Sequence, residues 1–164
     1  MNSDPTPIDD LPALRQAAID LIQTAGVCLH FYSPEVDPRL YDDPQLLDAL
    51  RSRISGTPRL GVYMLLPAAD AWHHACPRLV STAQRLTTNL ELRTVARETV
   101  HDRAQFERAF IIADRTDLIH QADPRRFIGS YRTRDPAQAA HLLAFFTDAW
   151  NRSQPDPELR LLRI

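Results

Sequence analysis

The sequence contains no lysine, only four glycines and only two cysteines among its 164 residues. Two cysteines without a CxxC pair provide no disulfide framework, and four scattered glycines form neither a GxGxxG nor a Walker A loop. No apolar run approaches the roughly 18 residues of a membrane span. The acidic start, residues 1–10, lacks the basic and apolar regions of a signal peptide. These absences predict a reduced, cytoplasmic protein without a membrane span.

The composition that remains is ordinary for a soluble globular chain. Apolar residues make up 44% and charged residues 24%, and the length suits one domain. Nine acidic residues and two arginines give residues 1–50 a charge of −7, and twelve acidic residues and seventeen arginines give residues 51–164 a charge of +5. The net charge of −2 provides no bulk attraction to polyanions, which argues against nucleic acid as a partner.

Helical and strand patterns alternate along the chain. Apolar residues recur at helical spacing in residues 10–25, and Asp-Pro pairs mark the starts of two further helices at residues 43–44 and 135–136. Short apolar runs predict strands at residues 27–33, 59–66, 90–96, 109–114, 118–122 and 127–131. The order predicts an α/β fold, with a mixed, mainly parallel sheet flanked by helices. We expect a flexible N-terminus at residues 1–9 and a single compact domain at residues 10–164.

The six histidines do not form a metal cassette. His73 and His74 are adjacent, so on a helix their side chains point about 100° apart and do not chelate one ion as an i, i+4 pair does. His30 lies inside an apolar strand and is interpreted as a core histidine whose hydrogen bonds are satisfied. We therefore expect no metal and no cofactor.

One segment carries a pattern with chemical meaning. Residues 101–136 read HDRAQFERAFIIADRTDLIHQADPRRFIGSYRTRDP. This resembles the second half of a phospholipase D-like motif, in which H-x-K-x4-D lies on a strand and is followed by a hairpin and G-S-x-N. Asp114, Gly129 and Ser130 match. The resemblance implies a phospholipase D-like fold, in which a histidine is the nucleophile and a lysine and an asparagine hold the phosphate.

The catalytic positions of that motif are occupied by other residue types. Glu107 stands at the histidine position, Ala109 at the lysine position and Arg132 at the asparagine position. His101 lies thirteen residues before Asp114 instead of seven. A carboxylate and a methyl group do not replace an imidazole and an ammonium, so we expect the hydrolytic chemistry to be lost.

The whole chain resembles a narrower family. The segments YSPEVDPRLYDDP, GSYRTRDP and WNRSQPDPELRLL look like those of a proteobacterial domain of unknown function, found alone or fused to GNAT-type acyltransferase domains. The resemblance covers residues 10–164 and implies a phospholipase D-like fold, with a GNAT-type acyltransferase as a candidate partner. The acetyl-CoA-binding loop of those enzymes is absent here.

The predicted function is that of a catalytically degenerate binding or regulatory module. Its ligand is expected to be a phosphate-bearing molecule or a protein, since arginine side chains hold phosphate in bidentate fashion. The predicted ligand-binding residues are Arg103, Arg108, Asp114, Ser130, Arg132 and Arg134. The alternative is a phosphodiesterase or phosphoryl-transfer enzyme that uses a displaced histidine, His101 or His120. By analogy with sites built from two motif copies, a chain with one copy is expected to form a homodimer.

Overall fold

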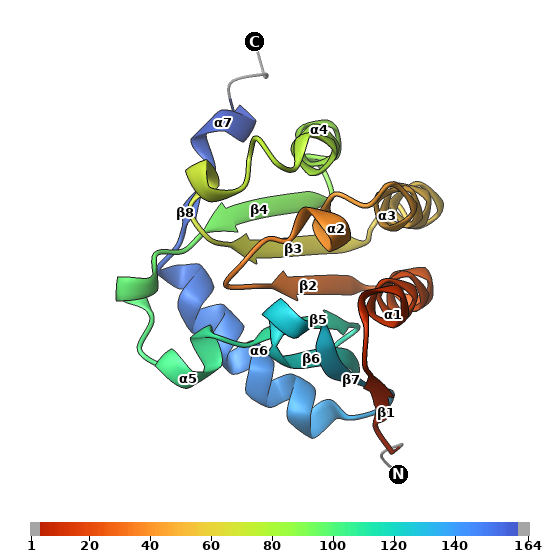
Figure 1. Ribbon diagram of the computed structural model, residues 1–164. Helices are drawn as coiled ribbons and strands as arrows, with labels where there is room; N and C mark the ends of the chain where they lie inside the picture. The colour runs from red at the N-terminus through yellow and green to blue at the C-terminus, as the bar shows by residue number, and fades with distance from the viewer. Residues whose placement is uncertain (1–3, 161–164) are drawn as a thin grey trace.

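The computed structural model describes residues 4–160, which form one mixed sheet flanked by helices (Figure 1). Eight strands pair in the order β1-β7-β6-β5-β2-β3-β4-β8. The strands are β1 (Thr6–Ile8), β2 (Cys28–Tyr32), β3 (Gly61–Leu66), β4 (Leu90–Thr94), β5 (Ala109–Ala113), β6 (Asp117–Asp123), β7 (Ile128–Arg132) and β8 (Gln154–Pro155). The predicted α/β fold with a single sheet between helices is confirmed.

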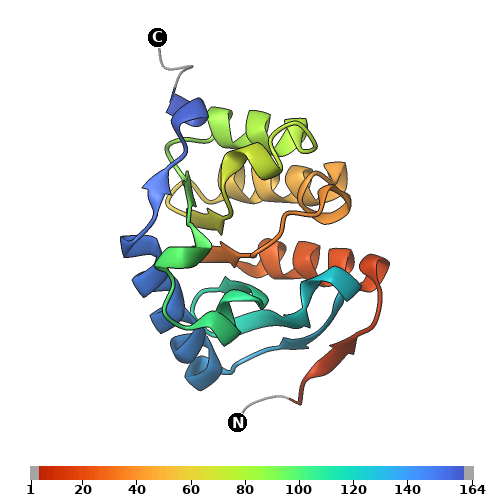
Figure 2. The same ribbon diagram turned by 60° about the vertical axis from the view of Figure 1, so that its left-hand side comes forward.

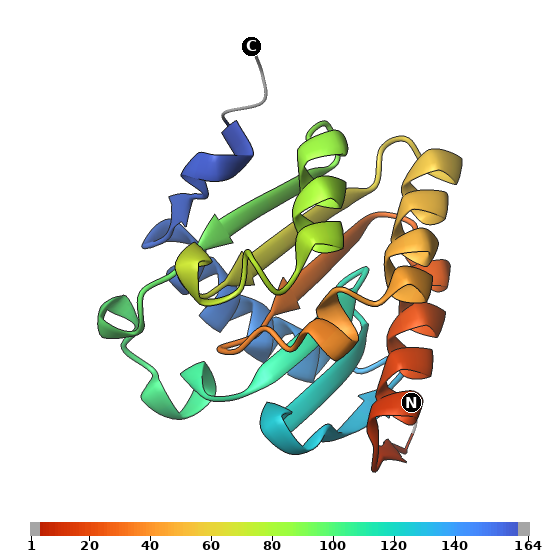
Figure 3. The ribbon, with the colours of Figure 1, turned by 45° about the horizontal axis from the view of Figure 1, so that its top comes forward.

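Helices cover both faces of the sheet. Figures 2 and 3 show α6 (Pro136–Asn151) on one side and α1 (Leu11–Thr24), α3 (Pro44–Gly56) and α4 (Pro77–Arg85) on the other. The short elements are α2 (Pro38–Tyr41), α5 (Arg103–Phe106), α7 (Pro157–Arg160) and the 3-10 turns η1 (Ala69–Ala71), η2 (Arg97–Thr99) and η3 (Pro124–Arg126). No helix within residues 4–160 is long and apolar enough to cross a membrane.

The predicted starts of the long helices are confirmed. Asp10, Asp43 and Asp135 each accept a hydrogen bond from the backbone N–H three residues further on. These bonds satisfy one of the N–H groups that a helix start leaves free. A proline follows two of these aspartates directly, where its missing N–H costs nothing.

The sheet contains more antiparallel pairing than predicted. Among the described strands, only β2–β3 and β3–β4 are parallel, and the other five pairings are antiparallel. Helical crossovers connect β2, β3 and β4, which permits parallel pairing. The three-residue turn at residues 114–116 and the short η3 join β5, β6 and β7 as antiparallel neighbours. The prediction of a mixed sheet is therefore confirmed, but the prediction that its strands are mainly parallel was wrong.

Both ends of the described chain contribute edge strands. Thr6–Ile8 pair with β7, and Ile8 is buried, so these residues belong to the sheet and not to the flexible N-terminus expected for residues 1–9. The C-terminal residues were predicted to dock back onto the domain. Leu159 packs against the core, whereas Leu161 and Leu162 lie outside the described residues.

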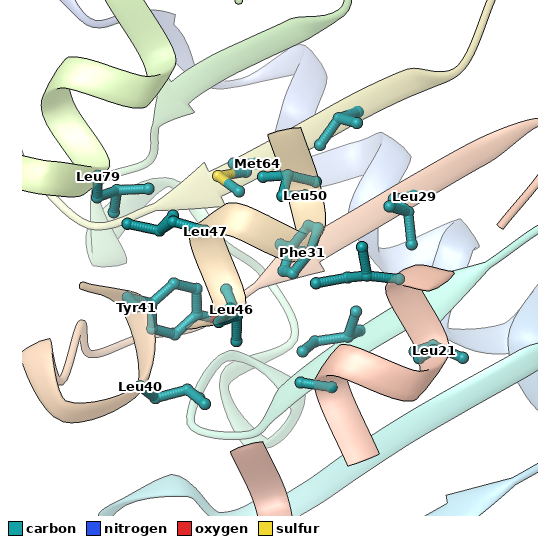
Figure 4. Packing of buried hydrophobic residues seen from close by; sticks show 14 of the residues in the cluster. Leu21, Leu29, Phe31, Leu40, Tyr41, Leu46, Leu47, Leu50, Met64 and Leu79 are labelled. Carbon is teal, nitrogen blue, oxygen red and sulfur yellow. The ribbon is translucent and has the colours of Figure 1, made fainter. Parts of the chain in front are cut away.

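Two apolar cores lie on opposite faces of the sheet. On one face, Phe31 and Met64 pack against helix residues that include Leu47 and Leu50 (Figure 4). The core on the α6 face comprises Tyr32, Leu65, Val95, Val100, Phe106, Phe110, Ile112, Leu118, Ala139, Leu142, Phe146 and Ala149. Because both faces are covered, the central strands are apolar along almost their whole length. The polar side chains on the α6 face of β6 and β7 stand out against this background.

Candidate functional site

The aspartate of the motif holds the β5–β6 turn to the start of β2. The Asp114 carboxylate accepts hydrogen bonds from the backbone N–H groups of Gly26, Val27 and Cys28 at 2.9, 2.7 and 3.1 Å. Asp114 and Arg115 adopt left-handed φ angles of 54° and 62°. Asp114 is one of the predicted ligand-binding residues, and in the structure its carboxylate oxygens accept these backbone hydrogen bonds. Its role in the structure is to position the turn.

The hairpin that follows brings His120 and Ser130 together. His120 on β6 lies directly opposite Ser130 on β7, and opposite Phe110 of β5 on its other side. Facing residues of antiparallel strands have Cα atoms roughly 4.5–5.5 Å apart. Phe110 belongs to the core beneath α6, so His120 and Ser130 lie on the α6 face of the sheet. The pairing is irregular beyond His120, where the register shifts before Asp123.

Two arginines complete this group, and we name Arg108, His120, Ser130 and Arg132 the arginine–histidine cluster. Arg132 follows Ser130 by two residues and therefore lies on the same face of β7. The pKa of His120 is lowered, first by burial and then by the positive charges of Arg108 and Arg132. The imidazole is therefore neutral at neutral pH, and the cluster carries two guanidinium charges beside a hydroxyl group.

The two arginines differ in how they are held. Arg132 Nη1 lies 3.3 Å from Asp135 Oδ2, and this aspartate is also the N-cap of α6. Arg108 is exposed and forms no ion pair with an acidic residue within residues 4–160. One guanidinium is thus fixed by the helix start, and the other is available to an anion from solvent.

The remaining predicted residues are not assembled into this cluster. His101 and Arg103 are exposed on α5 and the loop before it, and no contact within the described chain links them to His120. Arg134 is exposed, has a left-handed φ of 55°, and donates its backbone N–H to Asp117 Oδ1. Of the two histidines named for an enzyme, only His120 lies beside Ser130 and Arg132.

The positions of the motif's histidine and lysine hold no catalytic group. Glu107 Oε1 forms an ion pair with Arg97 Nη2 at 2.5 Å. Ala109 is buried in β5. No group of three or more histidine, cysteine or acidic side chains in the described residues has the arrangement of a metal site.

Two features of the fold were missed by sequence reasoning. His73 contacts Asp156 and Glu158 with its two ring nitrogens, both at 2.6 Å, although these residues are more than 80 positions apart. His30 was interpreted as a satisfied core histidine, but its Nδ1 is buried and has no hydrogen-bond partner. The sequence does carry a signal for His30, because a polar residue stands within an apolar strand. It carries no signal for the contacts of His73 with Asp156 and Glu158.

Solved structures share this fold at low sequence identity. Nuc from Salmonella typhimurium, a phospholipase D family member, matches with a TM-score of 0.67 and 14% identity over 93% of this chain and 98% of its own. NucT from Helicobacter pylori matches with a TM-score of 0.63 and 10% identity over the same shares. The archaeal chromatin protein TrmBL2, described by its novel mode of DNA binding, matches with a TM-score of 0.65 and 12% identity.

These matches show the fold and differ in extent. The match with TrmBL2 includes 93% of this chain but only 54% of the TrmBL2 chain, so this chain spans about half the length of that protein. No curated protein matches the sequence. A family model described as a domain of unknown function, DUF7931, matches residues 10–162. The chain is therefore a member of the DUF7931 family, with a phospholipase D-like fold.

Proposed function

We propose that this domain is a binding module for a phosphate-bearing ligand, held by the arginine–histidine cluster. The observation that carries the proposal is the position of His120, which has Ser130 opposite it and Arg108 and Arg132 near enough to lower its pKa. Guanidinium groups donate paired hydrogen bonds to phosphate oxygens, and a hydroxyl group adds a further donor. The cluster therefore offers several donors to one anion.

A binding role fits the residues better than the hydrolysis implied by the motif. At the positions of the motif's nucleophile and phosphate-holding lysine, this chain has Glu107, just before β5, and Ala109, the first residue of β5. Glu107 is paired with Arg97, and the Ala109 side chain has no group that can hold a phosphate. The fold resembles that of Nuc, a phospholipase D family member, and a phosphate ligand is compatible with that likeness.

The test is a calorimetric titration with inorganic phosphate and with glycerol 3-phosphate. Losing a hydrogen-bond partner of a charged group costs about 1.5–3 kcal/mol, so Arg108→Gln and Arg132→Gln should each weaken binding about tenfold to hundredfold. The matched control is Arg126→Gln, because Arg126 is exposed and pairs with Asp123 outside the cluster. Equal affinities in all three variants, or no binding by the unaltered protein, would contradict the proposal.

A second candidate, phosphodiester hydrolysis or phosphoryl transfer through the displaced His120, is favoured by one observation. A neutral imidazole beside two arginines has the protonation state of a nucleophile or a general base. Hydrolysis of bis(p-nitrophenyl) phosphate that disappears in His120→Asn but persists in His101→Asn would support it. Absence of turnover by the unaltered protein would contradict this second candidate and leave phosphate binding as the proposed function.

The GNAT-type partner, the homodimer and the cytoplasmic location stay predictions.

A further inference from the structure

A second polar site lies on the flank of α6, away from the arginine–histidine cluster. A groove of about 670 Å³ is lined by one stripe of α6, by His30 in the middle of β2 and by Arg115 in the β5–β6 turn. Its walls include His30 and Arg115 on the sheet side, and Leu143, Ala144, Asp148 and Asn151 on the helix side. Of these residues only Arg115 belongs to the motif segment, residues 101–136, and it is not among the predicted ligand-binding residues.

His30 is held rigidly in this groove but is not satisfied. Its ring stacks on Tyr63 with centroids 5.1 Å apart and meets the edge of Phe146 at 5.0 Å. Its Nδ1 is buried without a partner, and the ring forms no hydrogen bond to any residue among 4–160. Burial, and then the charge of Arg115, lower the pKa of His30 to about 4. An unpaired buried polar group is costly, and native proteins seldom keep one without a reason.

Arg115 supplies an uncompensated positive charge beside this imidazole. It is exposed, its φ of 62° is left-handed, and it hydrogen-bonds to the Cys28 thiol at the start of β2. It forms no ion pair with an acid in the described part of the chain. The Arg115 guanidinium therefore carries a charge that no carboxylate in residues 4–160 neutralises, next to a histidine whose Nδ1 has no hydrogen-bond partner.

We propose that this groove binds a small monocarboxylate with a hydrocarbon body. The Arg115 guanidinium matches the two oxygens of a carboxylate, and the His30 ring adds a hydrogen bond. Leu143 and Ala144 provide an apolar wall for the rest of the molecule.

The charges of the groove favour a monoanion over a phosphate. One guanidinium balances one negative charge, and the pKa of His30 keeps its imidazole neutral at pH 7. Asp148 lies on the same groove, although it is paired with Arg152 at 3.3 Å. A dianion would meet the repulsion of this carboxylate. The site is therefore distinct in chemistry as well as in position from the arginine–histidine cluster.

The test titrates the full chain with acetate, butyrate and hexanoate, and with inorganic phosphate as the competing class. Each buried methylene should raise affinity about fourfold, because it contributes about 0.8 kcal/mol. The ring signals of His30, followed by NMR, should shift on saturation. Its pKa should rise because the bound carboxylate stabilises the imidazolium form.

Three variants make the result decisive. Arg115→Gln should weaken hexanoate binding at least tenfold, and Ala144→Glu, which places a negative charge on an exposed position of the groove, should abolish it. Arg132→Gln should leave it unchanged, which separates this site from the proposed phosphate site. Equal affinity for the three carboxylates, preference for phosphate, or hexanoate binding that survives both groove variants would overturn the proposal. Circular dichroism confirms that each variant is folded.

Discussion

The substitution Asp114→Asn tests the contact that joins the β5–β6 turn to the start of β2. Oδ1 accepts hydrogen bonds from the N–H groups of Val27 and Cys28, and Oδ2 accepts one from Gly26. Asparagine has nearly the same shape and tolerates the left-handed φ of 54°. Its single carbonyl oxygen can keep the bonds from Val27 and Cys28, but its NH₂ group then faces the Gly26 N–H. The variant therefore changes only the chemistry of the carboxylate.

The expected loss of stability follows from that one contact. A hydrogen bond to a charged group contributes about 1.5–3 kcal/mol. In a domain of this length 1 kcal/mol shifts the melting temperature by about 2–4 °C, so Asp114→Asn should lower Tm by about 3–12 °C. Thermal unfolding followed by circular dichroism at 222 nm measures this.

The matched control is Asp48→Asn, since the Asp48 side chain is 71% exposed and contacts only Arg51 across one helical turn. Its unfolding free energy should change by less than about 0.5 kcal/mol. Equal Tm values for Asp114→Asn and the unaltered protein would refute the structural role of this carboxylate. A loss of phosphate affinity without a loss of Tm would instead support the predicted role of Asp114 as a ligand-binding residue.

Three further perturbations probe other parts of the fold. Gly129→Ala places a Cβ atom 2.4 Å from the backbone oxygen of His120, so β7 must shift, and urea unfolding should report a loss of about 1–3 kcal/mol. His73→Leu leaves the buried Asp156 carboxylate without its imidazole partner, which should cost about 3 kcal/mol and accelerate amide hydrogen exchange in β8 and α7. His30 has a folded-state pKa of about 4 against an ordinary 6.5. Its contribution to stability is complete above pH 6.5 and is lost as pH falls toward 4, so His30→Phe should reduce the drop in urea midpoint between pH 7 and pH 4.5.

Matched controls separate these effects from general damage. Gly56→Ala adds a Cβ with no atom within 4 Å, so it should be neutral or stabilising, and a loss equal to that of Gly129→Ala would contradict the steric argument. His74→Leu alters an exposed neighbour of His73 and should leave exchange in β8 and α7 unchanged. His141→Phe, also at an exposed position, should leave the pH dependence intact. An equal flattening in both histidine variants would show that burial of His30 is not the cause.

Much of the local structure can be predicted from the sequence because its causes lie within a few residues. The aspartate caps of α1, α3 and α6 bond to N–H groups only three positions away, and these helix starts were predicted. The apolar strands were predicted for the same reason, since burial on both faces leaves a continuous run. The relative direction of paired strands was harder to predict from the sequence. Most pairings are antiparallel, because short turns join β5, β6 and β7, and the strands near the two chain ends, β1 and β8, pair antiparallel with β7 and β4.

The site residues show where sequence information ends. The motif drew attention to Ser130, Arg132 and two histidines, but strand pairing selected His120 and left His101 outside. Such a choice depends on the register of β6 against β7, which the chain fixes through η3 and the shift beyond His120. The contacts of Asp114 with the start of β2, and of His73 with Asp156, join residues more than 80 positions apart. The sequence by itself determined the elements and their caps, because those bonds are local, and only the tertiary structure decided which distant charges and polar atoms meet.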